Sequence, residues 1–401
     1  MAGKGMFSGL KVLDFTNNLA GPEAAAQLAD YGAEVIHIEK PVYGDDCRNF
    51  PPMVENVGTS HFRVNRGKKS LVLDLKDPKA IEVVKKLLED TDILIESNRP
   101  GAMKRLGLSY EEVKLIKPDI IYCSISAFGQ KGPYAAKPGY DIIAQAYSGM
   151  LYYTGTPEGG PTKNATAIGD FVGAINAFSA ISAALYHRAM TGEGQHVDIS
   201  LARGLLWATA GFDFKFTGKH RKRMGNHDAQ LCPYGVFNGR NGSVVIGAVN
   251  VSLWKRLCAV MGKEELADDP RFKTNDARVE NKTLVIETIE EWLRGFEDVN
   301  EAARLIDDGG VPCIKAYTME DLAEDPHALE CGWIQEIPVP NNISSIPNLL
   351  SVVGLAEFSS VKPQKQRAPV LGQHNHEIME ACGMTSEEVN WYLDKWSNRE
   401  K

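Results

Sequence analysis

The sequence predicts an α/β protein with two domains, a larger one built on a Rossmann-like, doubly wound parallel sheet and a smaller α+β domain. Short apolar segments alternate with helix-like segments over residues 10–201, a pattern typical of parallel strands joined by crossover helices. The composition then changes near residue 225, where a hairpin-like segment begins. The length of 401 residues also favours two domains, because single cores usually stop growing before this size.

The larger domain begins with a strand, a helix and a second strand. Residues 10–15 and 33–40 are apolar strand segments, and the helix between them, at 21–32, has Pro22 near its start and Gly32 at its end. Further strands are predicted at 70–75, 92–97, 119–126 and 196–201, and further helices at 78–91, 110–118, 165–188 and 200–216. The segment 165–188 is small, apolar and Ala-rich, so we expect it to be buried.

The domain boundaries follow from the composition. We expect residues 225–325 to form the smaller domain, and residues 1–224 together with 326–401 to form the larger one. Within the smaller domain, the segment 234–249 predicts a β-hairpin with an Asn- and Gly-rich turn. Helices are predicted near 283–295 and 300–308, and two more in the C-terminal segment.

Charge and cysteine content exclude several classes of protein. The net charge of -8 disfavours nucleic acid as the main partner. The seven cysteines form no CxxC pair and no metal-like spacing with histidine, which is typical of free thiols in a reducing compartment. No apolar stretch has the length of a signal peptide core or a membrane span. We therefore expect a cytoplasmic protein with no metal site and no membrane partner.

Three common nucleotide or hydrolase motifs are missing. The first strand leads into FTNNLAGPEA, which lacks the G-x-G-x-x-G of dinucleotide-binding folds. No phosphate-binding P-loop and no G-x-S-x-G nucleophile elbow occurs. Dehydrogenase, ATP-driven and serine-hydrolase chemistry are therefore disfavoured.

Asp170 stands near the start of the predicted helix 165–188. Aspartate is a favoured N-cap residue, so helix capping is one interpretation. A helix N-terminus also favours a carboxylate and offers N–H donors to a developing oxyanion, so nucleophilic catalysis is the other. Gly169 and Gly173 are expected to leave room for a ligand to approach. The residues alone leave both interpretations open.

The order of several segments resembles one enzyme family. These segments are VLDF…AGP…AAAQLADYGAEVIHIEKP, NRGKKSLVLDLK, RPGAMKRLG, SAFGQKGPYAAKPGYDIIAQAYSG, AIGD and TGEGQHVDISL. Together they resemble the family III CoA-transferases, from about residue 8 to the C-terminal RAPVLGQH. The resemblance implies a Rossmann-like fold, an interlocked homodimer, and transfer of CoA from an acyl-CoA to a free carboxylic acid. It also implies that Asp170 is the nucleophile, forming first a mixed anhydride and then an aspartyl-CoA thioester. CoA is then a substrate, and no permanently bound cofactor is expected.

The resemblance also implies which residues bind CoA. They follow the ends of the first strands and the predicted helices: Asn18, Leu19, Ala20, Lys40, Leu73, Lys76, Ser97, Asn98, Arg99 and Arg105. Lys76, Arg99 and Arg105 suit phosphate groups on charge alone. A solvated surface position is the alternative for each charged residue.

Two other activities stay open. The α-methylacyl-CoA racemases resemble this sequence in motif order, but their G-H-D segment here reads GYD with Tyr140. A phenol with a pKa near 10 is a poor base at neutral pH, so we expect transfer; His187 or His227 would have to approach in space for racemisation. A non-catalytic CoA-binding protein is the second alternative.

The acyl group is a separate question. Residues 225–237 lack the glycine run of formyl-CoA transferase, which disfavours oxalate. The segment 139–149 is similar to the carnitine and bile-acid branch, and 2-hydroxyacyl transfer also stays open.

Overall fold

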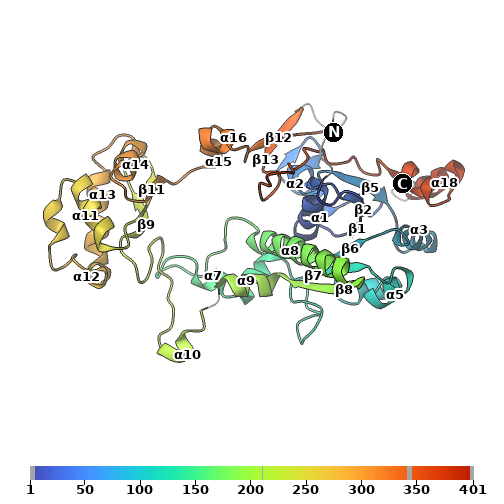
Figure 1. Ribbon diagram of the computed structural model, residues 1–401, viewed down its shortest axis with the longest axis horizontal. Helices are drawn as coiled ribbons and strands as arrows, with labels where there is room; N and C mark the ends of the chain where they lie inside the picture. Colours follow the sequence, from blue (N-terminus) through green and yellow to red (C-terminus); the bar gives the residue numbers. More distant parts are fainter. Residues whose placement is uncertain (1–4, 210, 341–345, 398–401) are drawn as a thin grey trace. The chain divides into compact units, whose positions relative to one another are not determined.

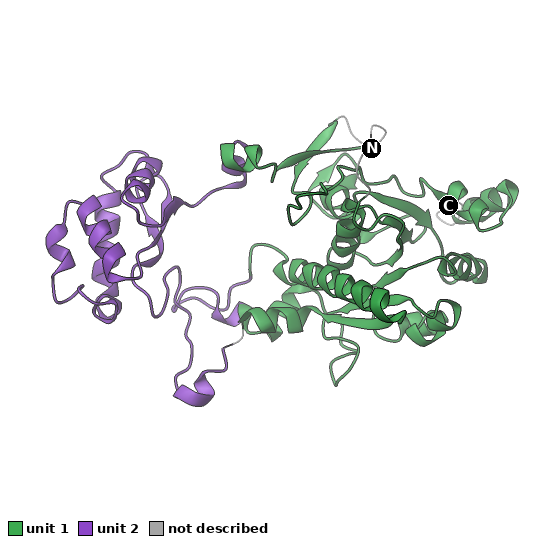
Figure 2. Cartoon of the chain, in the orientation of Figure 1, with its two compact units in different colours: residues 1–150, 164–210, 326–401 green, residues 151–163, 211–325 purple. Residues whose placement is uncertain are grey.

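The chain divides into two compact units (Figure 2). The computed structural model describes residues 5–209, 211–340 and 346–397. Unit 1 comprises residues 1–150, 164–210 and 326–401, and unit 2 comprises 151–163 and 211–325. The smaller unit is thus larger than the segment 225–325 that composition indicated, because the connection 211–224 and the excursion 151–163 belong to it.

Unit 1 contains a six-stranded sheet in the order β5-β2-β1-β6-β7-β8 (Figure 1). Every neighbouring pair is parallel. Its strands are β1 (Lys11–Phe15), β2 (Glu34–Glu39), β5 (Lys68–Val72), β6 (Ile93–Glu96), β7 (Ile121–Ser126) and β8 (Gln195–Ser200). The order runs outward from β1 on both sides, so the chain reverses direction across the sheet between β1 and β6. This confirms the predicted parallel α/β sheet, and such a reversal marks the usual ligand crevice.

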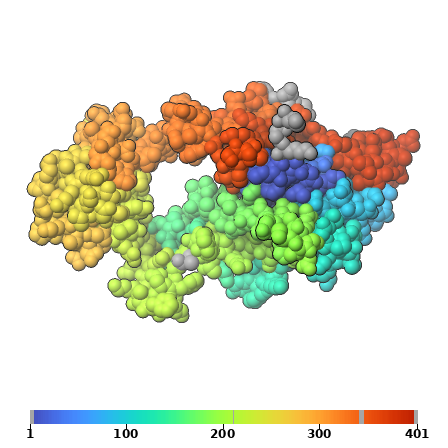
Figure 3. Space-filling model, viewed as in Figure 1, coloured from blue at the N-terminus to red at the C-terminus, as the bar shows by residue number. Residues whose placement is uncertain are grey.

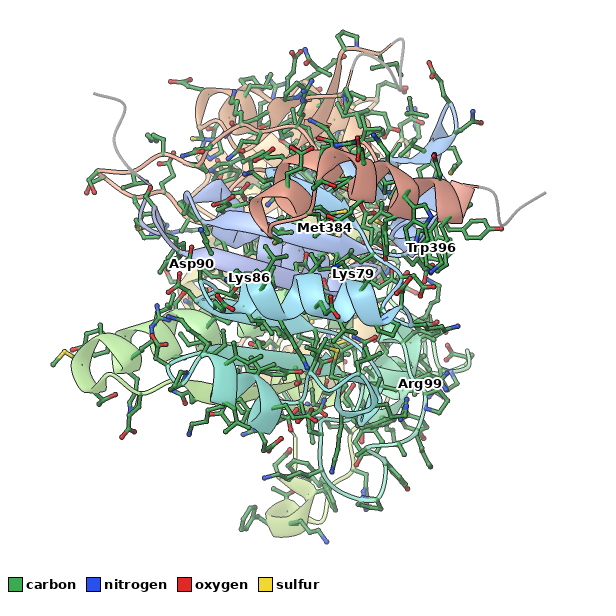
Figure 4. All side chains as sticks on the ribbon, turned by 90° about the vertical axis from the view of Figure 1, so that its right-hand side faces the viewer. Lys79, Lys86, Asp90, Arg99, Met384 and Trp396 are labelled. Atoms are coloured by element: carbon green, nitrogen blue, oxygen red, sulfur yellow. The ribbon has the colours of Figure 1, made fainter. Side chains whose placement is uncertain are left out.

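Helices cover both faces of this sheet. One face packs against α1 (Ala20–Asp30), α8 (Ile168–Thr191) and α9 (Leu201–Thr209), and the other against α3 (Pro78–Leu88), α5 (Tyr110–Ile116), α17 (Asn375–Ala381) and α18 (Ser386–Ser397). Successive strand residues serve opposite faces: Val12 packs with the first group and Leu13 with the second. Figure 4 shows α3 beside α18, with Lys79 and Lys86 on α3 and Trp396 on α18. The predicted C-terminal helices are confirmed as α17 and α18.

Helix α8 packs with one face only. Its small residues Ala174 and Ala177 are buried against α1, whereas Ile175, Tyr186 and Met190 are exposed. Figure 3 shows the green surface that α8 contributes. The expectation that this helix is buried therefore holds for its inner side only. By length and hydropathy alone α8 would be long enough to cross a membrane. That is weak evidence, because core helices of soluble proteins have the same properties.

The single helix expected over 200–216 is two helices. Helix α9 ends at Thr209, and α10 covers Phe214–Thr217 and ends at Gly218 in a left-handed conformation. Gly211 lies between the two helices, and glycine is among the poorest helix formers. The boundary between the two units also lies here.

Unit 2 is an α+β fold with a three-stranded antiparallel sheet in the order β11-β10-β9. Its strands are β9 (Tyr234–Asn238), β10 (Ser243–Gly247) and β11 (Cys313–Lys315), and its main helices are α11 (Val251–Val260), α12 (Asn275–Glu280), α13 (Lys282–Leu293) and α14 (Val299–Asp308). Phe237 and Trp254 lie in its apolar core. The predicted hairpin and the two predicted helices are confirmed.

Short elements complete the chain. They are η1 (Asp46–Asn49), β3 (Met53–Val54), β4 (Val57–Gly58), α2 (Thr59–Val64), α4 (Ala102–Arg105), α6 (Asp141–Tyr147), α7 (Met150–Tyr153), η2 (Glu264–Ala267), α15 (Met319–Ala323), α16 (Pro326–Glu330), β12 (Gln335–Pro338) and β13 (Asn348–Ser351). Of these, η1 contributes Asp46 and α6 contributes Asp141 to the site described below.

Candidate active site

A cavity of about 250 Å³ opens at the carboxyl ends of β1, β6 and β7. Its walls come from the turn 17–20 after β1, the turn 97–100 after β6, residues 125–127 at the end of β7, and the loop 135–140. Asp46, Asp170 and Leu201 complete the lining. The cavity therefore lies where the strand order reverses, the position at which doubly wound sheets bind ligands.

Asp170 lies in the first turn of α8 but does not cap it. The helix starts at Ile168, and the N–H of Gly169 donates a hydrogen bond to Asp141 Oδ1 at 2.6 Å. Helix capping was one interpretation of Asp170, but Asp141 is the residue that caps the start of α8. Within the described residues, the Asp170 side chain has no ion pair or hydrogen bond, and it faces the cavity half-buried.

The surroundings of Asp170 make its charged form costly. Burial, and then the negative charge of Asp141, raise the pKa of Asp170 to about 7. A carboxylate that is poorly solvated and unpaired is a stronger nucleophile than one held in an ion pair. The arrangement thus suits attack on an electrophile bound in the cavity.

Asp141 is held in place from its own helix. Gln145 donates from Nε2 to Asp141 Oδ2 at 2.6 Å, and its Oε1 accepts from the N–H of Asn164 at 3.0 Å. These bonds connect α6 to the segment that leads into α8. Asp141 therefore fixes the position of the first turn of α8, and with it that of Asp170.

Gly169 and Gly173 make room for protein atoms and not for a ligand. A Cβ atom at Gly169 would lie 2.8 Å from Asp141 Oδ1 and 3.0 Å from Leu205 Cδ1. A Cβ atom at Gly173 would lie 2.4 Å from Leu201 Cδ2. The expectation that these glycines admit a ligand was wrong; they let α6 and α9 approach the start of α8.

The structure brings six predicted CoA-binding residues to the cavity that contains Asp170. They are Asn18, Leu19, Ala20, Ser97, Asn98 and Arg99. The two turns that carry them are joined, because the N–H of Asn17 donates to Ser97 Oγ at 3.0 Å. Asn18 has a φ of 73°, a left-handed conformation that is uncommon for residues other than glycine.

Three of the other predicted residues border a neighbouring cavity of about 400 Å³. These are Lys40, Leu73 and Lys76, and Asn98 lines both cavities. Leu73 is buried in the core, whereas Lys40 forms an ion pair with Asp46. Arg105 lies exposed on α4 and lines neither cavity, so its role stays a prediction.

The sequence analysis assigned no residue of the wall 135–140 to CoA binding. Lys137 belongs to this wall and places its Nζ 3.7 Å from the ring centre of Tyr134. Gly139 allows the loop to approach the sheet, because a Cβ atom there would lie 2.6 Å from that of Ala127. The segment AAKPGYD was part of the resemblance, so its position in the sequence was the available signal.

No histidine lines the cavity among the residues that the structure describes. Tyr140 is present in its wall. His187 lies on α8, 17 residues beyond Asp170, which corresponds to roughly 25 Å along a helix. His187 therefore does not supply a second base for racemisation.

The sequence matches CoA-transferase family III over residues 7–375. The chain belongs to this family. It is 35% identical over 376 residues to succinyl-CoA:glutarate CoA-transferase from Homo sapiens, covering 92% of this chain and 84% of that one. It is 42% identical over 293 residues to acetyl-CoA:oxalate CoA-transferase from Acetobacter aceti, covering 72% and 75%.

A solved structure supports the family at the level of the fold. The CaiB/BaiF family protein from Brucella suis superimposes with a TM-score of 0.84 at 32% identity, covering 95% of this chain and all of that one. The family III member described here is thus an enzyme, an acyl-CoA:carboxylate CoA-transferase whose substrates are CoA thioesters. The predicted resemblance and enzyme class are confirmed.

Proposed function

We propose that this CoA-transferase uses Asp170 as its nucleophile and transfers CoA to a short dicarboxylic acid. The observation that carries the assignment is the unpaired, half-buried Asp170 carboxylate facing a cavity between the turns after β1 and β6. Asp141 takes the capping hydrogen bond, so Asp170 is left available for chemistry.

The first half-reaction forms an enzyme thioester. An Asp170 oxygen attacks the thioester carbonyl carbon, the C–S bond breaks, and CoA leaves as a thiolate. The thiolate then attacks the Asp170 carbonyl of the mixed anhydride and releases the donor acid as a carboxylate. In the second half-reaction the acceptor carboxylate attacks the aspartyl-CoA thioester, and the same two steps run in reverse order. Atoms and charges balance without ATP.

We assign both cavities to the binding of CoA. The turns at Asn18–Ala20 and Ser97–Arg99 line the cavity beside Asp170, and Lys40, Leu73 and Lys76 line the neighbouring one. CoA extends along both cavities, with its thioester at Asp170. Lys40 exchanges its partner Asp46 for a phosphate on binding. Arg105, exposed on the surface of α4, contacts a phosphate from outside the two cavities.

The acceptor is a short dicarboxylic acid. The two curated relatives are named for succinyl-CoA with glutarate and for acetyl-CoA with oxalate. These names favour a dicarboxylic acid as acceptor. They do not favour the carnitine, bile-acid or 2-hydroxyacyl substrates that the sequence left open. They also return oxalate to the candidate acceptors, although the glycine run is missing at 225–237.

A trapping experiment tests the nucleophile. The enzyme is incubated with succinyl-CoA, quenched with hydroxylamine and digested, and mass spectrometry locates the hydroxamate. We expect the hydroxamate on Asp170 and none in Asp170→Asn. Turnover is then measured with glutarate, oxalate and carnitine as acceptors, and we expect the dicarboxylates to be preferred. Full turnover by Asp170→Asn would contradict the assignment.

A second measurement separates transfer from racemisation. Incubation with a 2-methylacyl-CoA in D₂O without an acceptor acid should leave the α-proton unexchanged, because no histidine of the described residues lines the cavity. Exchange at the rate of turnover would favour the racemase alternative.

We also propose that the enzyme is an interlocked homodimer in the cytoplasm. All seven cysteines are free thiols, as in a reducing compartment. Large apolar side chains are exposed on α8 and α9, among them Tyr186, Met190 and Trp207. Exposed apolar groups of this kind mark interaction surfaces. A partner subunit would cover them.

A further inference from the structure

A fully buried set of charged side chains lies beneath the turn after β1. Asp14, His37 and Lys68 come from the three adjacent strands β1, β2 and β5, and their side chains are completely buried. Asp45, from the loop after β2, has a buried side chain in the same set. His37 and Asp45 border the cavity that also contains Lys40 and Lys76.

His37 lies between two carboxylates. Its Nδ1 is 2.9 Å from Asp14 Oδ2, and its Nε2 is 3.3 Å from Asp45 Oδ2. A neutral imidazole has only one N–H, so one of its nitrogens would direct a lone pair at a carboxylate oxygen. An imidazolium instead presents its positive charge to both carboxylates at ion-pair distance. With Lys68 Nζ at 2.7 Å from Asp14 Oδ2, two positive and two negative charges then balance, as buried charges require.

The other ionisable groups nearby are already compensated. Glu39 accepts two hydrogen bonds from Arg48, at 2.7 and 2.8 Å. His61 Nδ1 lies 3.1 Å from Asn65 Nδ2 and its Nε2 lies 3.1 Å from the carbonyl oxygen of Pro369. An amide donor on one side and a carbonyl acceptor on the other match a neutral imidazole.

The pKa values of the two histidines agree with this geometry. Burial alone would lower the pKa of His37, but the charge of Asp14 and the hydrogen bonds to Asp14 and Asp45 raise it to about 9. Burial, and then the charge of Arg48, lower the pKa of His61 to about 3. The chain thus contains one charged and one neutral buried histidine.

Both carboxylates that contact His37 also hold the turn. The second oxygen of Asp14 accepts from the N–H of Thr16 at 2.9 Å, and the second oxygen of Asp45 accepts from the N–H of Asn18 at 2.9 Å. Asn18 has a left-handed conformation, which is uncommon for residues other than glycine and needs support from its surroundings. His37 therefore ties together the two acceptors that shape the turn 16–20.

We propose that the bridge Asp14–His37–Asp45 is a positioning device that holds the turn after β1 in the conformation that receives CoA. His37 is a positioning residue in this sense, since its fully buried side chain acts on the turn through Asp45 and Asn18. The inference rests on the proposed binding of CoA at Asn18–Ala20.

The bridge predicts a specific change in binding. His37→Gln removes the positive charge and leaves two buried carboxylates close together, so the turn loses its fixed shape. Hydrogen bonds to charged groups contribute on the order of tenfold to a hundredfold in an equilibrium constant, and we expect the Kd for CoA to rise by about tenfold or more. The kcat at saturating acyl-CoA changes less, because Asp170 is positioned by Asp141.

His61→Gln is the matched control. It is the same substitution at an equally buried histidine, but it replaces a neutral group by a neutral amide that both donates and accepts. Titration calorimetry with CoA is run on the full chain of wild type and of both variants, after circular dichroism has confirmed their folding. An equal effect of the two substitutions on the Kd would overturn the positioning role.

A measurement on the wild-type protein keeps the inference testable if His37→Gln does not fold. Neutron diffraction from crystals grown at pH 7.5 locates the deuterium atoms, and we expect one on each ring nitrogen of His37 and only one on His61. A neutral His37 overturns the bridge whichever reaction the enzyme catalyses. A wild-type protein that binds no CoA overturns both the proposed function and the role assigned to the bridge.

Discussion

At the scale of single residues, two carboxylates meet the start of α8 and perform different tasks. Asp141 accepts a hydrogen bond from the N–H of Gly169 at 2.6 Å, while Asp170 faces the cavity. The charge of Asp141 is one of the two causes that raise the pKa of Asp170 to about 7. The positioning residue thus also sets the pH range in which the proposed nucleophile is charged.

A pH profile tests this coupling. Only the ionised form of Asp170 attacks, so single-turnover formation of aspartyl-CoA should increase with pH and level off above about 7, the raised pKa of the folded enzyme. Asp141→Asn removes the neighbouring charge and keeps an oxygen for the Gly169 N–H. It should lower the pKa of Asp170 and move the acid limb to lower pH by up to about one unit.

Asp298→Asn provides the control for that profile. Asp298 accepts a capping hydrogen bond at α14 in unit 2, and its substitution should leave the limb in place. An acid limb that does not move in Asp141→Asn would show that Asp141 does not act on Asp170 through its charge.

At the scale of secondary-structure elements, the sequence predicts the strands of the sheet well because their apolar runs are continuous. Burial on two faces by α1 and α3 requires such runs. The interruption of the helix expected over 200–216 has a local cause, since Gly211 lies between α9 and α10. The exposed outer side of α8 has no local cause, because the burial of its apolar residues depends on contacts beyond its own sequence.

The sequence predicted residues of the candidate site only where they belong to the motifs shared with the family. The meeting of Asp141 with Gly169 depends on how α6 packs near α8, which no local pattern contains. The buried bridge did leave a signal, because Asp14 and His37 are polar residues inside runs that otherwise predict buried strands, whereas Lys68 precedes the strand expected at 70–75. Polar residues in such positions need partners, and Asp14 and His37, which pair in register on adjacent strands, indicate each other.

The close backbone contact just before β8 leads to a prediction about the stability of this strand. Gly194 precedes β8, and a Cβ atom there would lie 2.2 Å from the carbonyl oxygen of Ile120 and 2.4 Å from the carbonyl carbon of Asp119. Backbone atoms cannot move aside as a side chain can, so Gly194→Ala should shift β8 and destabilise the chain by about 3 kcal/mol. Gly160→Ala, where a Cβ atom meets nothing within 4 Å, is the control in denaturant unfolding. Equal unfolding midpoints for the two variants would contradict the close contact.

At the scale of the whole molecule, the exposed side of α8 is a feature that a single chain does not explain. Its inner side packs on α1 and the sheet, whereas Tyr186 is 70% exposed and Met190 is 69% exposed. Large apolar side chains in contact with water are costly when they cluster. A second subunit on this surface would remove the cost.

Sedimentation equilibrium tests that expectation on the full chain. Wild type should sediment as a dimer at micromolar concentration, because a shared apolar surface disfavours the separated chains. Charges introduced by Tyr186→Glu and Met190→Glu would have to be buried in the interface, so the double variant should dissociate by tenfold or more, about 1.4 kcal/mol, with its fold retained. Leu115→Glu is the control, since Leu115 is 85% exposed on α5, away from α8 on the opposite face of the sheet. A monomeric wild type contradicts the homodimer, and an unchanged double variant moves the interface away from α8.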